Sequence, residues 1–199
     1  MKFLKRKKSG YTIIETMIAV SLFIIIVMVG MGALLNANLL HKKSQNMRSI
    51  IDNLSFVLED ISRNLRTGYN YHCISPNSSD FSNLGAPRNG DPCGGIAFEY
   101  QNGNVGNLND QWVYFISNNK SGGFGVFKSI DGGSNSVQLT PDEIDIDPVS
   151  FFSVFGAEAD DGGQPRASVK LSGKIIYNNV ETPFSLRTSV SQRALDLGI

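Results

Sequence analysis

Residues 16–40 form an apolar stretch in which no side chain carries a charge. The stretch is rich in Ile, Val, Leu, Phe and Met, and it exceeds the roughly 20 residues that a helix needs to cross a lipid bilayer. The pattern therefore predicts a membrane-spanning helix close to the N-terminus.

A second helical pattern follows the apolar stretch. Apolar residues recur at intervals of one, three and four positions, which marks a stripe along one face of an amphipathic helix. Together the two patterns predict one continuous helix from about Tyr11 to Arg66, roughly 80 Å long. Its first part, residues 11–36, is expected to lie in an apolar environment such as a membrane, and its second part, residues 37–66, is expected to pack on a domain. The predicted stripe consists of Met47, Ile50, Ile51, Leu54, Val57, Leu58, Ile61 and Leu65.

The amino-acid composition of the chain changes after the predicted helix. Residues 67–95 are rich in Gly, Ser, Asn, Asp and Pro, which is typical of a connecting loop. In residues 96–199 short apolar runs with a period of two alternate with turn-forming spacers, which predicts β-strands. A mostly antiparallel sheet packed on the amphipathic half of the helix would bury both apolar faces, so we expect an α+β fold.

Seven strands are expected in this region, and a tight turn at residues 178–179 is expected to join the last two into a C-terminal hairpin. The expected strands span residues 96–100, 112–116, 124–128, 137–140, 149–155, 169–177 and 180–190.

The balance of charged residues bears on whether the chain binds nucleic acid. The 199 residues carry 18 Lys and Arg against 18 Asp and Glu. Residues 1–10 hold five of the cations and no acid, so the remainder carries 18 − 5 = 13 cations against 18 anions, a balance of −5. A basic surface for DNA or RNA is not evident, and we expect no nucleic-acid partner.

The five cations of residues 1–10 are closely spaced and precede the apolar stretch. These cations, at residues 2–8, should remain in the cytoplasm under the positive-inside tendency, although Lys42, Lys43 and Arg48 dilute the asymmetry. We therefore place the bulk of the chain outside the cytoplasm. A secretory signal peptide keeps its cleavage site after the apolar core, whereas here the basic segment ends in Gly10, before the core.

The most specific motif is KSGYTIIETMIAV at residues 8–20. It resembles the leader junction of type IV pilins and type II secretion pseudopilins, in which a membrane-embedded prepilin peptidase cuts after the Gly and methylates the new N-terminal amine. The resemblance implies that residues 1–10 are a cleaved cytoplasmic leader. It also implies that Gly10 precedes the cut, that Tyr11 becomes the N-methylated first residue, and that Glu15 is the acidic fifth residue of the mature chain. Tyr11 stands where Phe is commoner in the family.

The resemblance also implies a fold and a set of partners. The fold is pilin-like, with a long helical stem and an α+β head. The partners are the prepilin peptidase, the membrane, an assembly platform and other pilin or pseudopilin subunits. Residues 47–66 and the tail at 188–193 look like those of minor pilins and J-type minor pseudopilins, which implies a role in initiation or at the tip.

Glu15 calls for a partner on physical grounds as well. A carboxylate within an apolar helix costs up to roughly 2.5 to 3.5 kcal/mol at the bilayer centre. In a filament of staggered helices, the N-terminal ammonium of one subunit can lie beside Glu15 of its neighbour, neutralise it and set the axial register. The alternative is that Glu15 lies at the headgroup level of a simple signal anchor.

Cys73 and Cys93 enclose 19 residues of the expected loop. Outside the cytoplasm such a pair is expected to form a disulfide. Closing a loop of this size is worth about 3 kcal/mol in the chain-entropy model. A reactive thiol at Cys73, beside His72, is the alternative, although no third orienting group is apparent. The spacing is not that of a zinc site.

No catalytic motif is present. The chain has two histidines, His41 and His72, and no H-E-x-x-H, G-x-S-x-G or P-loop string, so we expect neither an enzyme nor a cofactor. One acidic set offers several oxygens to calcium but lacks the spacing of a known calcium loop, and we interpret it as a solvated edge without assigning metal ligands. The set consists of Asp142, Glu143, Asp145 and Asp147.

The resemblance and the patterns leave three functions open. The leading one is a structural pilus or pseudopilus subunit, a single-pass inner-membrane protein with an extracytoplasmic head that then enters an extracellular or periplasmic filament. The second is a tip adhesin or DNA-uptake subunit on the same scaffold. The third is a signal-anchored extracytoplasmic enzyme or receptor.

Overall fold

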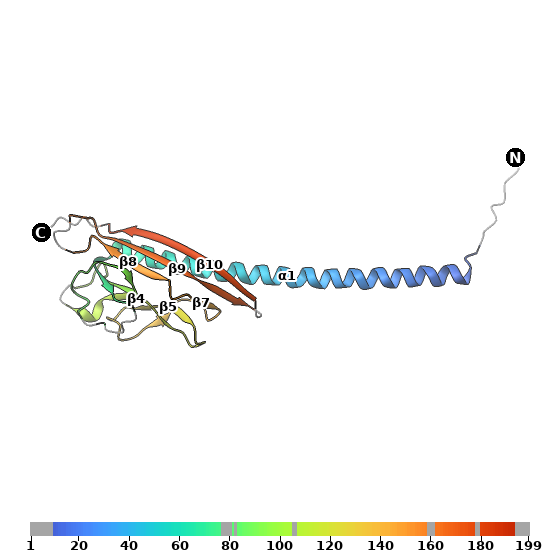
Figure 1. The fold of residues 1–199 in the computed structure, drawn as a ribbon, viewed down its shortest axis with the longest axis horizontal. Coiled ribbons are helices and arrows are strands. Elements are labelled where there is room, and N and C mark those ends of the chain that lie inside the picture. The colour runs from blue at the N-terminus through green and yellow to red at the C-terminus, as the bar shows by residue number, and fades with distance from the viewer. Residues whose placement is uncertain are drawn as a thin grey trace, which may run out of the picture. The chain divides into compact units, whose positions relative to one another are not determined.

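A computed structural model describes residues 10–76, 81, 83–104, 107–158, 162–177 and 180–193. The basic residues of the leader and the expected turn at 178–179 lie outside these ranges. The chain divides into two units, residues 1–46 and 47–199. One helix, α1 (Ile13–Thr67), begins in the first unit and ends in the second (Figure 1). The predicted continuous helix is therefore confirmed.

In the second unit, one face of α1 is buried. The buried side chains recur at intervals of four, three, four and four, as one helical face requires. Ile51 was predicted to belong to this stripe, but 43% of its surface is exposed, because a step of one residue turns the side chain about 100° around the helix. The buried helix residues are Ile50, Leu54, Val57, Ile61 and Leu65.

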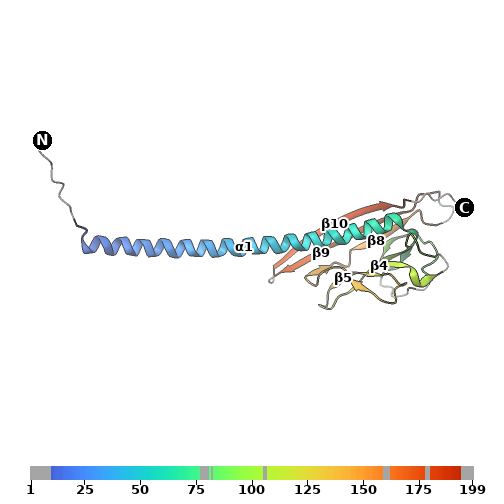
Figure 2. The same cartoon turned by 180° about the vertical axis from the view of Figure 1, so that it is seen from behind.

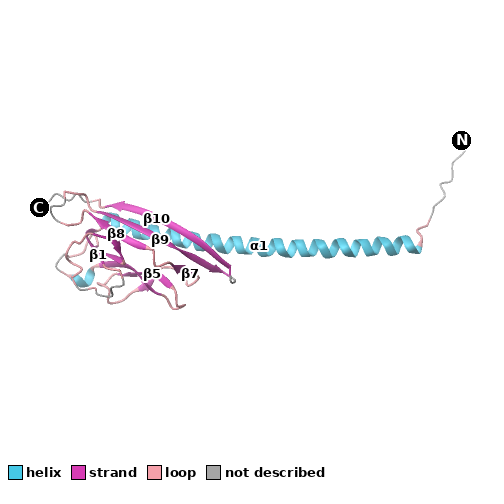
Figure 3. Ribbon diagram, viewed as in Figure 1, coloured by secondary structure: helices cyan, strands magenta, loops and turns pink. Residues whose placement is uncertain are grey.

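The strands form two antiparallel sheets rather than one (Figure 3). The first sheet has the order β1-β3-β4-β5-β6, and the second has the order β10-β9-β8-β2, with β7 paired to β9. In both Figure 1 and Figure 2, β9 and β10 run beside the C-terminal part of α1.

The bounds of the first sheet are β1 (Tyr69–Ile74), β3 (Gly95–Glu99), β4 (Trp112–Asn118), β5 (Phe124–Ser129) and β6 (Val137–Gln138). Those of the second are β2 (Gly90–Cys93), β7 (Ile144–Ile146), β8 (Phe151–Phe155), β9 (Arg166–Tyr177) and β10 (Val180–Ser191). A short 3-10 helix, η1 (Leu108–Asp110), lies between β3 and β4.

One hydrophobic cluster joins the helix to both sheets. Leu54 and Ile61 of α1, Phe98 of the first sheet, and Phe152 and Leu171 of the second all belong to it and are fully buried. The expected α+β fold, a long N-terminal helix packed with antiparallel sheets, is therefore confirmed.

The prediction that residues 67–95 form a loop is wrong in two places. β1 begins directly after the helix, and its Tyr71, Cys73 and Ile74 are buried. β2 contains Pro92 but lies at the edge of its sheet, where a missing backbone donor is tolerated. Both strands are short and polar in part, so the loop-like composition of the whole window concealed them.

Candidate functional site

The predicted cleavage point lies immediately before the helix. Gly10 and Tyr11 precede the first helical residue, Ile13, and 82% of the Tyr11 side chain is exposed. The peptide bond between Gly10 and Tyr11 is therefore accessible in the chain, outside the hydrogen-bonded part of α1.

Glu15 lies in the first turn of α1. The backbone N–H of Glu15 donates to the Thr12 carbonyl at 3.1 Å and lies 3.4 Å from Thr12 Oγ1. The order Thr12 to Glu15 matches a capping box, in which a hydroxyl begins the helix and an acid stands three residues on. A negative charge at this position is also favoured by the helix dipole. This contact of the Thr12 hydroxyl with the Glu15 N–H was missed in the sequence, although the T-x-x-E spacing signals it.

The first unit exposes its apolar surface. From Ile13 to Leu40, the large hydrophobic side chains are between 37% (Val27) and 81% (Ile13) exposed. Within the part of the chain that the structure describes, α1 is the helix that is long and apolar enough to cross a membrane. A helix that is apolar on all sides needs lipid or other helices around it. This segment is therefore suited either to span a bilayer or to pack among similar helices.

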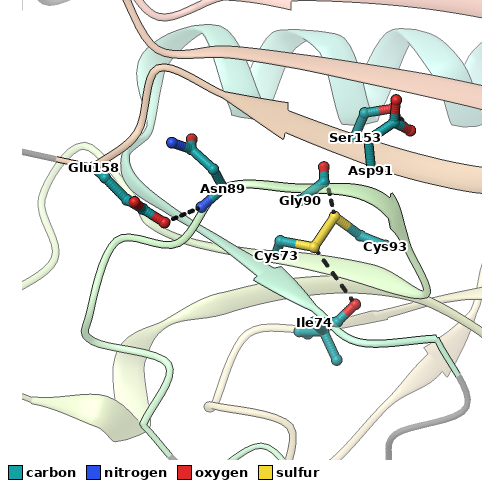
Figure 4. The surroundings of a disulfide bond; sticks show 8 residues. All are labelled: Cys73, Ile74, Asn89, Gly90, Asp91, Cys93, Ser153 and Glu158. Atoms are coloured by element: carbon teal, nitrogen blue, oxygen red, sulfur yellow. Dashed lines mark hydrogen bonds between the residues drawn. A yellow bond between two sulfur atoms is a disulfide. The ribbon is translucent and has the colours of Figure 1, made fainter. Parts of the chain in front are cut away.

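The expected disulfide is confirmed. Cys73 of β1 and Cys93 of β2 are bonded, with their Cα atoms 5.5 Å apart (Figure 4). Gly90 fits closely beside them, because a Cβ at this position would overlap the Cys73 sulfur. The alternative of a reactive Cys73 thiol is wrong. The adjacent His72 is buried and pairs through Nδ1 with the Ala86 carbonyl at 2.6 Å.

Polar contacts hold β2 and its flanking residues on β8 and the turn after it. Ser153 Oγ donates to Asp91 Oδ1 at 3.1 Å. The backbone N–H of Asn89 donates to Glu158 Oε1 at 3.0 Å (Figure 4). The Ala157 N–H donates in turn to the Asn89 side chain at 2.9 Å. The disulfide therefore sits in an ordered strand pairing rather than in a free loop.

Asp60 connects the helix to the first sheet. Tyr114 Oη and Lys128 Nζ donate to its Oδ2 at 2.7 and 3.0 Å, and Asn64 Nδ2 donates to its Oδ1 at 2.9 Å. Partial burial alone would raise the pKa of Asp60, but the three hydrogen bonds and the Lys128 charge outweigh it and lower that pKa. Burial of Tyr114 itself, together with its bond to Asp60, raises the pKa of Tyr114.

The acidic set at residues 142–147 is not brought together as a metal site. Asp142 accepts from the Gln138 amide at 3.1 Å, and Asp145 accepts from the Phe124 N–H at 3.1 Å. No group of three or more His, Cys, Asp or Glu side chains converges among the described residues. Asp145 instead lies within β7, between the buried Ile144 and Ile146, a strand that the sequence analysis did not predict.

A hollow of about 430 Å³ opens on the second unit. It is lined mainly by apolar side chains from both sheets and the loops beside them, including Pro92, Phe115, Phe124, Val149 and Phe151. Its volume lies within the range of small-molecule pockets.

Comparison of the chain with protein-family models, with curated proteins and with solved structures finds no match. The function is therefore inferred from the residues and the geometry described above.

Proposed function

We propose that this chain is a minor pilin or pseudopilin, a structural subunit of a type IV pilus or a type II secretion pseudopilus. In this proposal α1 first anchors the chain in the inner membrane, with the head outside the cytoplasm. Prepilin peptidase then cuts after Gly10 and methylates Tyr11. The mature subunit leaves the bilayer and joins a filament, in initiation or at the tip.

One observation supports the proposal above the others. An exposed Gly10–Tyr11 bond stands immediately before a helix that carries Glu15 in its first turn and exposes apolar side chains over its next seven turns or so. The same helix continues into a second unit, where one face is buried in a folded core. A helix of this kind is a membrane anchor before assembly and a packing element afterwards.

The chemistry of assembly in this proposal is charge neutralisation. Moving Glu15 from the membrane surface into a bundle of apolar helices removes water from its carboxylate, which is unfavourable without a counter-charge. The ammonium of Tyr11, freed by cleavage after Gly10, supplies that charge from a neighbouring subunit. Cleavage is therefore a precondition of assembly, because the uncut chain has no ammonium at this point.

Site-specific photo-crosslinking tests the proposal. A photoreactive residue replaces Phe23, which is 65% exposed in the apolar segment, and a matched control replaces Phe56, which is 66% exposed on the second unit. We expect the probe at residue 23 to capture the helices of other pilin-like subunits when the assembly platform is active, and lipid when it is not. Capture of lipid alone, with the assembly platform active and with it inactive, would contradict a filament role. The chain with the probe at residue 56 must be present at the same level in both conditions.

A second candidate is a ligand-binding subunit on the same scaffold, such as a tip adhesin. The apolar hollow between Phe115 and Val149 favours it. Saturable binding of a defined glycan by the full chain in detergent, lost on Val149→Asp, would support this role. Absence of binding across a glycan panel would leave the structural role as the better account.

A further inference from the structure

A buried acidic cluster lies at one end of the first sheet. Glu99 is the last residue of β3, Asp110 ends η1, and Gln111 directly precedes β4. The Glu99 and Gln111 side chains are fully buried, and Asp110 is half-buried. All three therefore belong to the single hairpin that connects β3 to β4.

Three oxygens of this cluster have no hydrogen-bond donor within the described part of the chain: Glu99 Oε2, Asp110 Oδ1 and Gln111 Oε1. The other Glu99 oxygen accepts from Gln111 Nε2 at 2.8 Å. A buried acceptor without a donor destabilises a fold, and a buried carboxylate oxygen does so most. The arrangement therefore calls for a positive group that the hairpin itself does not supply.

The backbone of the hairpin passes close to one of these atoms. A Cβ on Gly103 would lie 2.7 Å from Glu99 Oε2, so the chain at Gly103 passes directly beside that oxygen. The Gly103 carbonyl accepts from Tyr69 Oη at 3.0 Å and keeps a second lone pair. The Asn104 N–H donates to Asp110 Oδ2 at 3.1 Å, which fixes the carboxylate against the loop.

Among the described residues, no basic side chain forms an ion pair with the acids of the cluster. The ion pairs of the described residues join Arg63 to Glu59, Lys128 to Asp60 and Lys174 to Glu181. None of them reaches Glu99 or Asp110. Burial raises the pKa of Glu99, the Gln111 hydrogen bond opposes that rise, and the nearby Asp110 charge adds to it.

We propose that Glu99, Asp110 and Gln111 bind a calcium ion. The unpartnered acceptors are all oxygens, from two carboxylates and an amide, and oxygen is the ligand that Ca²⁺ takes in flexible loop geometry. Two carboxylates match its double charge. The cluster holds no His or Cys, so zinc and other transition metals are disfavoured. The site does not depend on the proposed filament function.

Calorimetry and thermal unfolding of the full chain in detergent test this proposal. After removal of metal by a chelator, we expect CaCl₂ to bind saturably with one ion per chain. At about 100 times the dissociation constant it should raise the unfolding midpoint by about 5 °C or more. Mg²⁺ is expected to bind at least about tenfold more weakly, because it tolerates irregular coordination poorly. No saturable Ca²⁺ binding, or equal binding of both ions, would overturn the proposal.

Variants place the ion in the hairpin. Asp110→Asn keeps the shape of a half-buried residue and should weaken Ca²⁺ binding at least about tenfold, a loss of about 1.4 kcal/mol. Glu143→Gln, which alters an exposed acid of the other acidic set, is the matched control and should bind as the unaltered chain does. Terbium luminescence excited through Trp112, which stacks on Tyr100 at 4.4 Å, gives a second readout. Terbium emission that Ca²⁺ fails to displace, or that Asp110→Asn leaves unchanged, would contradict the assignment.

Discussion

Cys73 and Cys93 connect the two sheets of the second unit through their edge strands. Cys73 lies on β1 at one end of the first sheet, and Cys93 lies on β2 at one end of the second, with the two Cα atoms 5.5 Å apart. Both side chains belong to the hydrophobic cluster that also holds the helix. The disulfide therefore closes the chain between the two layers at the point where the backbone crosses from one sheet to the other.

Removal of this disulfide should destabilise the second unit. For Cys73→Ala combined with Cys93→Ala, we expect a loss of about 3 kcal/mol, since the unfolded chain regains the freedom of the closed loop. Chemical unfolding of the full chain in detergent, followed by the fluorescence of Trp112, the one tryptophan of the sequence, measures it. The reduced unaltered chain serves as the comparison and should show a similar loss. An unchanged midpoint in both would contradict this role.

The helix face that packs on the sheets should dominate the stability of the second unit. Leu54→Ala removes a fully buried side chain and is expected to cost about 2 to 5 kcal/mol. Ile51→Ala, on the exposed side of the same helical turn, should change the free energy of unfolding by no more than about 0.5 kcal/mol. Equal losses for the two variants in the same unfolding assay would show that the assigned face is wrong.

Asp60 should give the second unit a specific acid sensitivity. Its pKa in the folded chain lies below its ordinary value of 3.8, so its ionised form stabilises the fold above that pH. This contribution is lost as the pH falls through the lowered pKa. Asp60→Asn should therefore be less stable than the unaltered chain near neutrality, by about 1 kcal/mol for a partly exposed site. The difference should shrink as the pH falls below 3.8.

Unfolding midpoints measured from pH 7 to pH 2.5 or so test this pH dependence. Glu59→Gln is the neighbouring control, because Glu59 pairs with Arg63 on the exposed surface of α1 and should contribute little. A stability difference for Asp60→Asn that stays constant down to the lowest pH would show that its carboxylate is not held in the ionised form.

Substitutions can separate the cap at the start of α1 from the proposed role of the Glu15 charge in assembly. Glu15→Gln keeps a side chain that can complete the capping box but removes the charge, whereas Thr12→Ala removes the cap and keeps the charge. We expect Glu15→Gln to insert and to be cleaved normally, yet to enter filaments at least about tenfold less, a loss of about 1.4 kcal/mol. Thr12→Ala should assemble. Quantitative blots of sheared filaments and membranes measure the assembly of each variant. Normal assembly of Glu15→Gln together with lost assembly of Thr12→Ala would contradict a role of the Glu15 charge in assembly.

The helix and most strands could be predicted because each shows its own periodicity. The spacing from Ile50 to Leu65 is that of one helical face, and β9 and β10 are long enough for a clear alternation. β7 was missed because three residues, with Asp145 between two isoleucines, are too few to show a period in an acidic segment. The division into two sheets was missed because it depends on contacts between distant strands.

Only part of the candidate functional residues could be predicted from the sequence. Gly10, Tyr11 and Glu15 form a local motif, and the structure adds the Thr12 cap to it. The Glu99 cluster had no signal in the sequence, because Glu99 stands at a strand end like any surface acid. Its burial depends on Gln111, twelve residues further on, and on the path of the loop at Gly103.

The central claim is that this chain is processed as a pilin-like subunit. Mass spectrometry of the intact N-terminus, on membrane-associated protein from cells with and without active prepilin peptidase, tests it most directly. The account predicts a chain that begins at N-methylated Tyr11 only when the peptidase is active. A chain that begins at Met1 in both cells would contradict the account and would leave a signal-anchored extracytoplasmic domain in its place.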